Sequence, residues 1–138
     1  LDGPGFLLQG QKVRHLRDLE QGSIGVLQGS STLAVIRYRL PRSQLVPLST
    51  YEAGLIALNH GRIDALAGDV TVLTGIQQEQ PGYGLLPNLM TAEPLGIAIP
   101  KGNQFSSLET LVNQAVAEWH QSGWLQERVN FWGLPQEP

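Results

Sequence analysis

The chain has 138 residues, a formal net charge of −3 and no cysteine, with 41% hydrophobic and 15% charged residues. This length suits one compact domain or one lobe of a larger protein, and the low charge excludes disorder driven by charge repulsion. The lack of cysteine excludes a disulfide framework and a thiolate metal site. The mild acidity argues against a nucleic-acid partner. No apolar stretch approaches the roughly 20 residues that span a bilayer.

Short aliphatic runs alternate with segments of helical periodicity in the first third of the chain. The predicted elements are a strand at 5–9, a helical turn at 15–20, a strand at 24–28, a helix at 31–40 and a strand at 44–48. Pro41 ends the helix, because proline cannot continue the hydrogen-bond ladder. Pro47 confines the last strand to a sheet edge.

The remainder of the chain continues this alternation. Ser49-Thr50-Tyr51-Glu52 has the form of a capping box, in which the Ser49 hydroxyl and the Glu52 carboxylate bond backbone N–H groups at a helix start. The elements that follow are a helix to His60, a strand at 63–67, a helix at 70–78, strands at 83–89 and 95–99, a helix behind a second capping box at 106–109, and a helix at 124–131.

The helix behind the second capping box has one apolar face. Its apolar stripe consists of Leu108, Leu111, Val112, Ala115 and Trp119. We expect Trp119 in the core and Trp132 as the anchor of the C-terminus, with stacking on a ligand as the less favoured alternative, because large aromatic side chains dominate cores.

Strands and helices joined by short connections predict a fold of the α/β class. Such alternation produces βαβ units, and hence a three-layer arrangement of a mainly parallel sheet flanked by helices. The alternation breaks between residues 84 and 93, which makes this segment the most plausible boundary.

The first candidate site is the turn Gln28-Gly29-Ser30-Ser31-Thr32, between a buried strand and a helix. In open α/β sheets, ligands bind beyond the carboxyl ends of the strands. Free backbone N–H groups, hydroxyl side chains and the positive end of the helix dipole together suit a carboxylate or phosphate. The alternative is that Ser30 or Ser31 merely caps the helix.

The second candidate is Asp69, which directly follows the strand ending in Ala67-Gly68. We expect its carboxylate on the same sheet edge as the Gly29 turn, where an anion-binding turn and an acid could hold the two ends of a zwitterion. The alternative is that Asp69 caps the helix beginning at Val70. Asp64, in contrast, is expected to order the preceding turn together with Arg62.

Enzymatic and metal-binding patterns are weak in this sequence. His15, His60 and His120 are scattered without metal-ligand spacing, and no nucleophile elbow G-x-S-x-G occurs. No pair of carboxylates stands out as an acid–base couple. We therefore expect a protein without catalytic residues, cofactor or metal.

Five stretches of sequence cover nearly the whole chain and carry a family resemblance. They are V-R-H-L-R-D-L-E (13–20), I-G-V-L-Q-G-S-S-T (24–32), S-T-Y-E-A-G-L-I-A-L-N-H-G-R-I-D-A-L-A-G-D (49–69), E-P-L-G-I-A-I-P-K-G-N (93–103) and G-W-L-Q-E-R-V-N-F-W-G (123–133). In this order and spacing they resemble the family-3 extracytoplasmic solute-binding proteins of bacterial amino-acid ABC transporters.

The resemblance implies a two-lobed clamshell, a periplasmic-binding-protein fold with an amino acid in its cleft. It implies that residues 1–9 form a hinge strand, 10–90 the second lobe, and 91–138 the return hinge and C-terminal helices of the first lobe. Most of the first lobe, including an arginine for the ligand carboxylate, would precede this sequence, which begins with Leu1. We therefore expect a truncated clamshell that binds weakly and associates with itself through the exposed apolar stripe.

The resemblance also assigns ligand contacts. It places the ligand's α-carboxylate on Gly29–Thr32 and its α-ammonium on Asp69. Leu27 and Gly68 fall where some relatives direct polar side chains toward the ligand's own side chain, so the second lobe would contribute shape rather than charge there.

The implied function is binding of a free polar L-amino acid for delivery to an ABC permease in the periplasm or another extracytoplasmic space. A receptor channel or sensor kinase that uses the same lobe is the first alternative. A dehydratase-like enzyme on this fold is the second, with Asp69 as its acid. A purely structural or interaction domain is the third.

Overall fold

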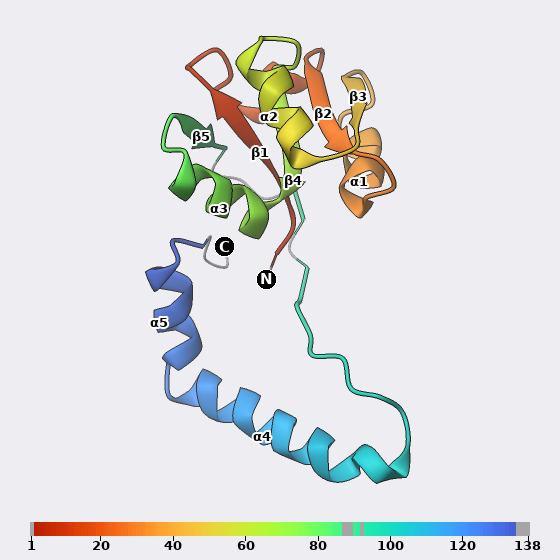
Figure 1. Cartoon of the computed structure of the whole chain (residues 1–138), viewed down its shortest axis with the longest axis vertical. Helices are drawn as coiled ribbons and strands as arrows, with labels where there is room; N and C mark the ends of the chain where they lie inside the picture. The colour runs from red at the N-terminus through yellow and green to blue at the C-terminus, as the bar shows by residue number, and fades with distance from the viewer. Residues whose placement is uncertain (1, 87–89, 92, 135–138) are drawn as a thin grey trace. The chain divides into compact units, whose positions relative to one another are not determined.

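The computed structural model describes residues 2–86, 90–91 and 93–134 (Figure 1). The chain divides into two compact units, Leu1–Glu93 and Pro94–Pro138. The first unit contains a sheet with helices on both faces, whereas the second contains helices.

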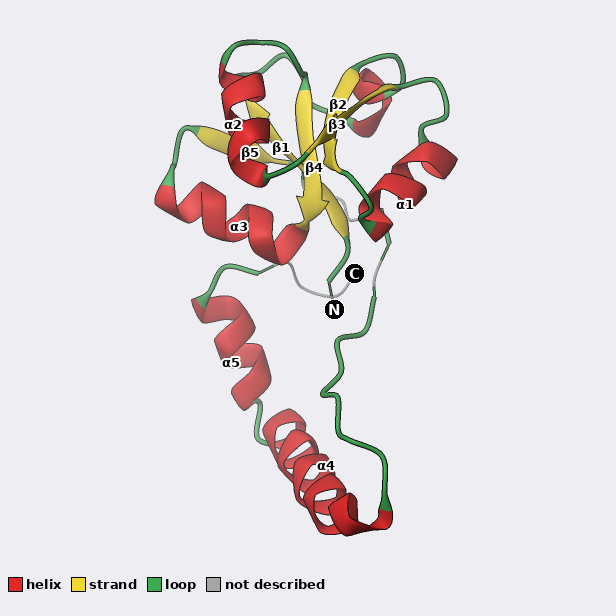
Figure 2. Ribbon diagram, turned by 45° about the vertical axis from the view of Figure 1, so that its right-hand side comes forward, coloured by secondary structure: helices red, strands yellow, loops and turns green. Residues whose placement is uncertain are grey.

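The first unit is built on a sheet of five strands in the order β3-β2-β4-β1-β5. The strands are β1 (Pro4–Gln9), β2 (Ser23–Leu27), β3 (Gln44–Leu48), β4 (Ala65–Asp69) and β5 (Tyr83–Leu85). β2 runs parallel to β3 and β4, while β1 is antiparallel to β4 and β5. The predicted α/β sheet is confirmed as mostly parallel, and the predicted edge position of the proline-containing strand β3 is also confirmed. The carboxyl ends of β2, β3 and β4 lie at one edge of the sheet, as Figure 2 shows for β4.

Helices cover both faces of this sheet, which gives the three layers predicted. They are α1 (Ser31–Arg39), α2 (Tyr51–Asn59), α3 (Val70–Glu79) and the 3-10 helix η1 (Leu16–Leu19). Successive strand residues point to opposite faces, so Phe6 packs into the cluster under α1 and η1 while Leu7 packs into the cluster under α2 and α3.

Two boundaries in the first unit differ from their predictions. Thr50, not Ser49, caps α2: its hydroxyl accepts a hydrogen bond from the N–H of Ala53 at 3.1 Å. The predicted capping box is therefore wrong by one residue, because the chain stays extended through Thr50. The strand predicted at 63–67 lies at Ala65–Asp69, since the chain is still leaving α2 at Arg62, whose N–H bonds the carbonyl of Ala57. Part of the strand predicted at 83–89 lies outside the described residues.

The second unit contains η2 (Asn103–Phe105), α4 (Ser106–Gln121) and α5 (Trp124–Phe131). The strand predicted at 95–99 is wrong: the segment is irregular, with Leu95 71% and Ile97 59% exposed. A strand needs a neighbour to satisfy its backbone groups, and no described residue pairs with this segment. The second capping box is also wrong, because η2 runs directly into α4 and places Ser106 inside the helix.

The apolar residues of the second unit are exposed. None of its described residues is buried, so the prediction of Trp119 in the core is wrong. Its indole packs instead on that of Trp124, with ring centroids 5.3 Å apart. Trp132 is 57% exposed and packs edge-on against Phe131. The amphipathic pattern is present, but among the described residues of the second unit its apolar face covers no buried core.

Asp64 lies near the start of β4, at the opposite end of the strand from Asp69. Its carboxylate accepts hydrogen bonds from the N–H of Ser23 at 2.9 Å and from Lys12 at 2.9 Å. The predicted partnership with Arg62 is replaced by these two groups, which join β4 to β2 and to the segment after β1. The Ser23 N–H and then Lys12 hold the pKa of Asp64 below its usual value.

We predict that Asp64→Asn destabilises the fold in a pH-dependent way. Because the pKa of Asp64 is lowered by folding, its contribution is complete above the unfolded value and is lost as pH falls through the folded value. In urea unfolding at neutral pH, the free energy of unfolding of Asp64→Asn should be lower than that of wild type by on the order of 1 kcal/mol. This difference should become smaller near pH 3. A gap of equal size at both pH values would contradict the prediction; Glu79→Gln serves as control.

Candidate functional site

The candidate site is the edge of the sheet where β2, β3 and β4 end, here called the rim. Three segments meet there: the turn after β2, the start of α2 after β3, and Asp69 at the end of β4. Parallel strands bring their carboxyl ends to the same edge, and helices that follow such strands direct their first N–H groups toward it. The rim therefore carries the residues predicted from the sequence as a site.

The turn after β2 is shaped by Gly29 and capped by Ser30. Gly29 has φ +72°, a left-handed conformation that side chains disfavour. The Ser30 hydroxyl accepts a hydrogen bond from the N–H of Leu33 at 3.3 Å and donates one to the carbonyl of Leu27 at 2.8 Å. The capping alternative is thus confirmed for Ser30. Ser31 is exposed at the first position of α1, and its N–H has no partner within the helix.

Thr32 and Asp69 are brought together from different elements of the rim. Thr32, in the first turn of α1, is only 2% exposed. Its hydroxyl donates a long hydrogen bond of 3.4 Å to Oδ1 of Asp69. The alternation of β4 explains the contact: Ala67 and Asp69 lie on the α1 side, and Gly68 lies on the other. The shared sheet edge expected for the Gly29 turn and Asp69 is therefore present.

Asp69 does not cap the helix that follows it. Although it occupies the N-cap position of α3, its side chain makes no capping hydrogen bond. Asp2, from the entry to β1, takes this role: its carboxylate accepts the N–H of Thr71 at 3.2 Å and the Thr71 hydroxyl at 2.7 Å. The capping alternative for Asp69 is wrong. Among the described residues, its carboxylate at the rim accepts the long hydrogen bond from the Thr32 hydroxyl.

Gly68 and Tyr51 form the other side of the rim. A Cβ atom built on Gly68 would lie 2.6 Å from Cε1 and from the hydroxyl oxygen of Tyr51, so the Tyr51 ring covers this glycine. Leu27, at the end of β2, is half-buried and packs with Tyr51 against the same apolar cluster. The sequence did not single out Tyr51 as a site residue. The available signal was its position shortly after the predicted strand 44–48, because residues that follow parallel strands lie at the rim.

The Tyr51 phenol is held in its protonated form. Burial raises its pKa, a hydrogen-bond interaction with the backbone of Asp69 opposes this, and the carboxylates of Asp69 and Asp2 raise it further. At neutral pH the rim therefore presents a neutral hydroxyl beside acidic groups.

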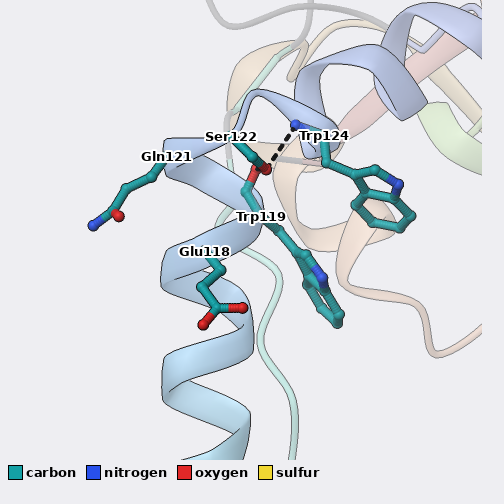
Figure 3. Close-up of a pocket in the computed structure, with 5 residues that line it drawn as sticks. All are labelled: Glu118, Trp119, Gln121, Ser122 and Trp124. Atoms are coloured by element: carbon teal, nitrogen blue, oxygen red, sulfur yellow. Dashed lines mark hydrogen bonds between the residues drawn. The ribbon is translucent and has the colours of Figure 1, made fainter.

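A hollow of about 520 Å³ lies elsewhere, in the second unit (Figure 3). It is open to solvent and is lined by residues at the junction of α4 and α5, including Trp119 and Trp124. The Ser122 hydroxyl accepts the N–H of Trp124 at 3.4 Å and orders this junction. None of the predicted site residues lines this hollow, which reflects the turn between two helices rather than a built polar site.

Across residues 2–86, 90–91 and 93–134, no helix combines the length and apolarity that crossing a bilayer requires. In the same part of the chain, no three His, Asp or Glu side chains gather into a group suited to a metal ion.

Comparison with known proteins places these features in context. No protein-family model matches the sequence. It is 30% identical over 131 residues to the glutamine-binding protein of a Bacillus subtilis ABC transporter, covering 94% of this chain and 47% of that protein. It is 30% identical over 124 residues to arginine-binding protein 1 of an Escherichia coli ABC transporter, covering 86% and 50%.

Solved structures agree on the fold. An ancestral solute-binding protein for cationic amino acids superposes with a TM-score of 0.75 at 22% identity, over 95% of this chain and 58% of that one. The chain thus spans about half the length of these relatives. All three are named as binding proteins, and none as an enzyme.

We predict that Asp2 and Asp69, although both flank α3, differ in their effect on stability. Asp2→Ala removes the cap of α3 and should lower the free energy of unfolding by about 1 kcal/mol. Asp69→Asn removes no cap and should leave it within about 0.5 kcal/mol of wild type. Urea unfolding of both variants measures the difference, and a larger loss for Asp69→Asn than for Asp2→Ala would contradict the assignment.

Proposed function

We propose that this chain, which belongs to the family-3 solute-binding proteins of amino-acid ABC transporters and spans about half of such a protein, forms the second lobe of the clamshell together with the return into the first. In this proposal residues 10–90 are the second lobe, with 1–9 and 91–138 as crossing segments and C-terminal helices. The pairing of Asp2 with Glu93 supports it, because their mutual backbone hydrogen bonds of 2.9 and 2.7 Å bring the chain before β1 and the chain at residue 93 side by side.

The proposed ligand is a polar amino acid held by its two charged ends at the rim. Its α-carboxylate would meet the N–H groups of the turn Gly29–Thr32, where the dipole of α1 favours negative charge. Its α-ammonium would meet Asp69. One observation carries this proposal: Asp69 contacts Thr32 at the rim, and its carboxylate does not cap α3 because Asp2 does so instead. Glutamine and arginine, named for the relatives, are the first ligands to test.

The proposed mechanism is closure of the clamshell around this ligand. An amino acid that touches both lobes stabilises the closed arrangement by its extra contacts, and so shifts the population toward it. The ligand-loaded protein would then deliver its amino acid to the membrane subunits of an ABC permease from an extracytoplasmic space. The single lobe described here contributes the ammonium site and part of the carboxylate site, so it should bind more weakly than a complete clamshell.

We predict that L-glutamine or L-arginine binds the rim of this chain and that Asp69→Asn weakens binding at least about tenfold, the effect of losing a charge-assisted hydrogen bond. Amide chemical shifts followed by NMR during titration with each amino acid would locate and quantify the interaction. The matched control is Glu79→Gln at the far end of α3. Equal affinity in wild type and Asp69→Asn would refute the ammonium assignment.

We also predict that the chain associates with itself through the second unit. In that unit, the side chains of Leu111, Trp124 and Phe131 are 62%, 44% and 67% exposed. Such exposed apolar surface favours association with a second copy. Light scattering over a wide concentration range should show dimers, which Leu111→Lys should weaken. Tyr38→Lys, at an 83% exposed position of the first unit, is the control. A concentration-independent monomer would disprove this.

A further inference from the structure

Tyr51 is a rim residue to which the proposed function gives no role. It is the first residue of α2, at the carboxyl end of β3, and its ring lies over Gly68 at the end of β4. Because a Cβ at position 68 would approach the ring to 2.6 Å, the ring fills the space that a side chain at 68 would need. On the α2 side of β4, the surface next to Asp69 is therefore formed by the Tyr51 side chain and not by a side chain at position 68.

The surroundings of the ring are acidic. Asp69 follows Gly68 directly, and Asp2 lies at the start of α3 with its carboxylate bound to Thr71. Burial is the main cause that raises the pKa of Tyr51, and the charges of Asp69 and Asp2 act in the same direction as smaller contributions. An aromatic face attracts cations, and nearby carboxylates repel an anion placed on it. The same position is thus favourable for positive charge and unfavourable for negative charge.

We propose that Tyr51 is a specificity-determining residue, whose ring over Gly68 favours amino acids with a cationic side chain over those with an anionic one. The inference rests on the proposed function, because it needs a ligand whose ammonium group lies at Asp69. The proposal places the ligand's side chain beside the Tyr51 ring, which covers Gly68, the residue next to Asp69 in β4. The sequence suggested shape alone at this place, since Leu27 and Gly68 carry no charge; the structure adds the aromatic group from a third element.

The test compares three probes, L-arginine, L-glutamine and L-glutamate, by NMR titration of the 138-residue chain. Wild type should bind arginine more tightly than glutamate. Tyr51→Leu keeps an apolar side chain of moderate size but removes the aromatic face, and should reduce the arginine-to-glutamate affinity ratio about two- to fivefold. Tyr51→Phe keeps the face and should retain the ratio. Tyr38→Leu, which alters an exposed tyrosine on α1, is the matched control and should leave the ratio unchanged.

The outcomes separate this inference from the proposed function. If wild type binds and Asp69→Asn weakens binding, but Tyr51→Leu leaves the ratio unchanged, the role of Tyr51 is overturned and the proposed function stands. A uniform loss of affinity for all three probes in Tyr51→Leu also overturns it, because that indicates a merely structural residue. If wild type binds none of the three, the proposed function falls and this inference falls with it.

Discussion

The hydrogen bonds between Asp2 and Thr71 cap α3, so the carboxylate of Asp69 at the rim does not have to do so. A helix that begins directly at the end of a strand needs an acceptor for its first N–H groups, and the residue at its N-cap normally provides one. Here the acceptor comes from the segment before β1, 69 residues away in sequence. The local carboxylate, Asp69, is consequently available, and the antiparallel pairing of β1 with β4 is what brings Asp2 to the right place.

The alternation of side chains along β4 then divides the rim into two halves. Asp69 lies on the side of α1, where Thr32 and the first N–H groups of the helix are found, while Gly68 lies on the side of α2, under the Tyr51 ring. Successive strand residues necessarily point to opposite faces. In the proposed function, the ammonium and carboxylate groups of the ligand would meet the half of the rim that contains Asp69 and the start of α1, and the side chain of the ligand would meet the aromatic half.

The two units of the chain differ in how they use their apolar residues. In the first unit, both faces of the sheet are covered, and residues such as Phe6 and Leu66 are fully buried. In the second unit, α4 has the periodicity of a core-facing helix but packs against no core of its own. Burial of apolar area is the main driving force of folding, so the exposed stripe is the feature of this chain that most needs a partner surface. This is consistent with a chain that spans about half of its relatives.

The fold class and nearly all element types could be predicted from the sequence, because they depend on local periodicity. The placement of the Gly29 turn and Asp69 at one sheet edge could also be predicted, because parallel strands end at the same edge. Helix caps were predicted less well: Ser49, Ser106 and Asp69 each had the residue type of a cap, but the true acceptors depend on the backbone around Thr50 and η2 and on the distant Asp2. The strand predicted at 95–99 failed for the same reason, since a strand exists only where another chain segment pairs with it. The position of Tyr51 over Gly68 was likewise decided by tertiary structure alone, because it joins residues from α2 and β4 whose contact depends on helix packing and not on any spacing in the sequence.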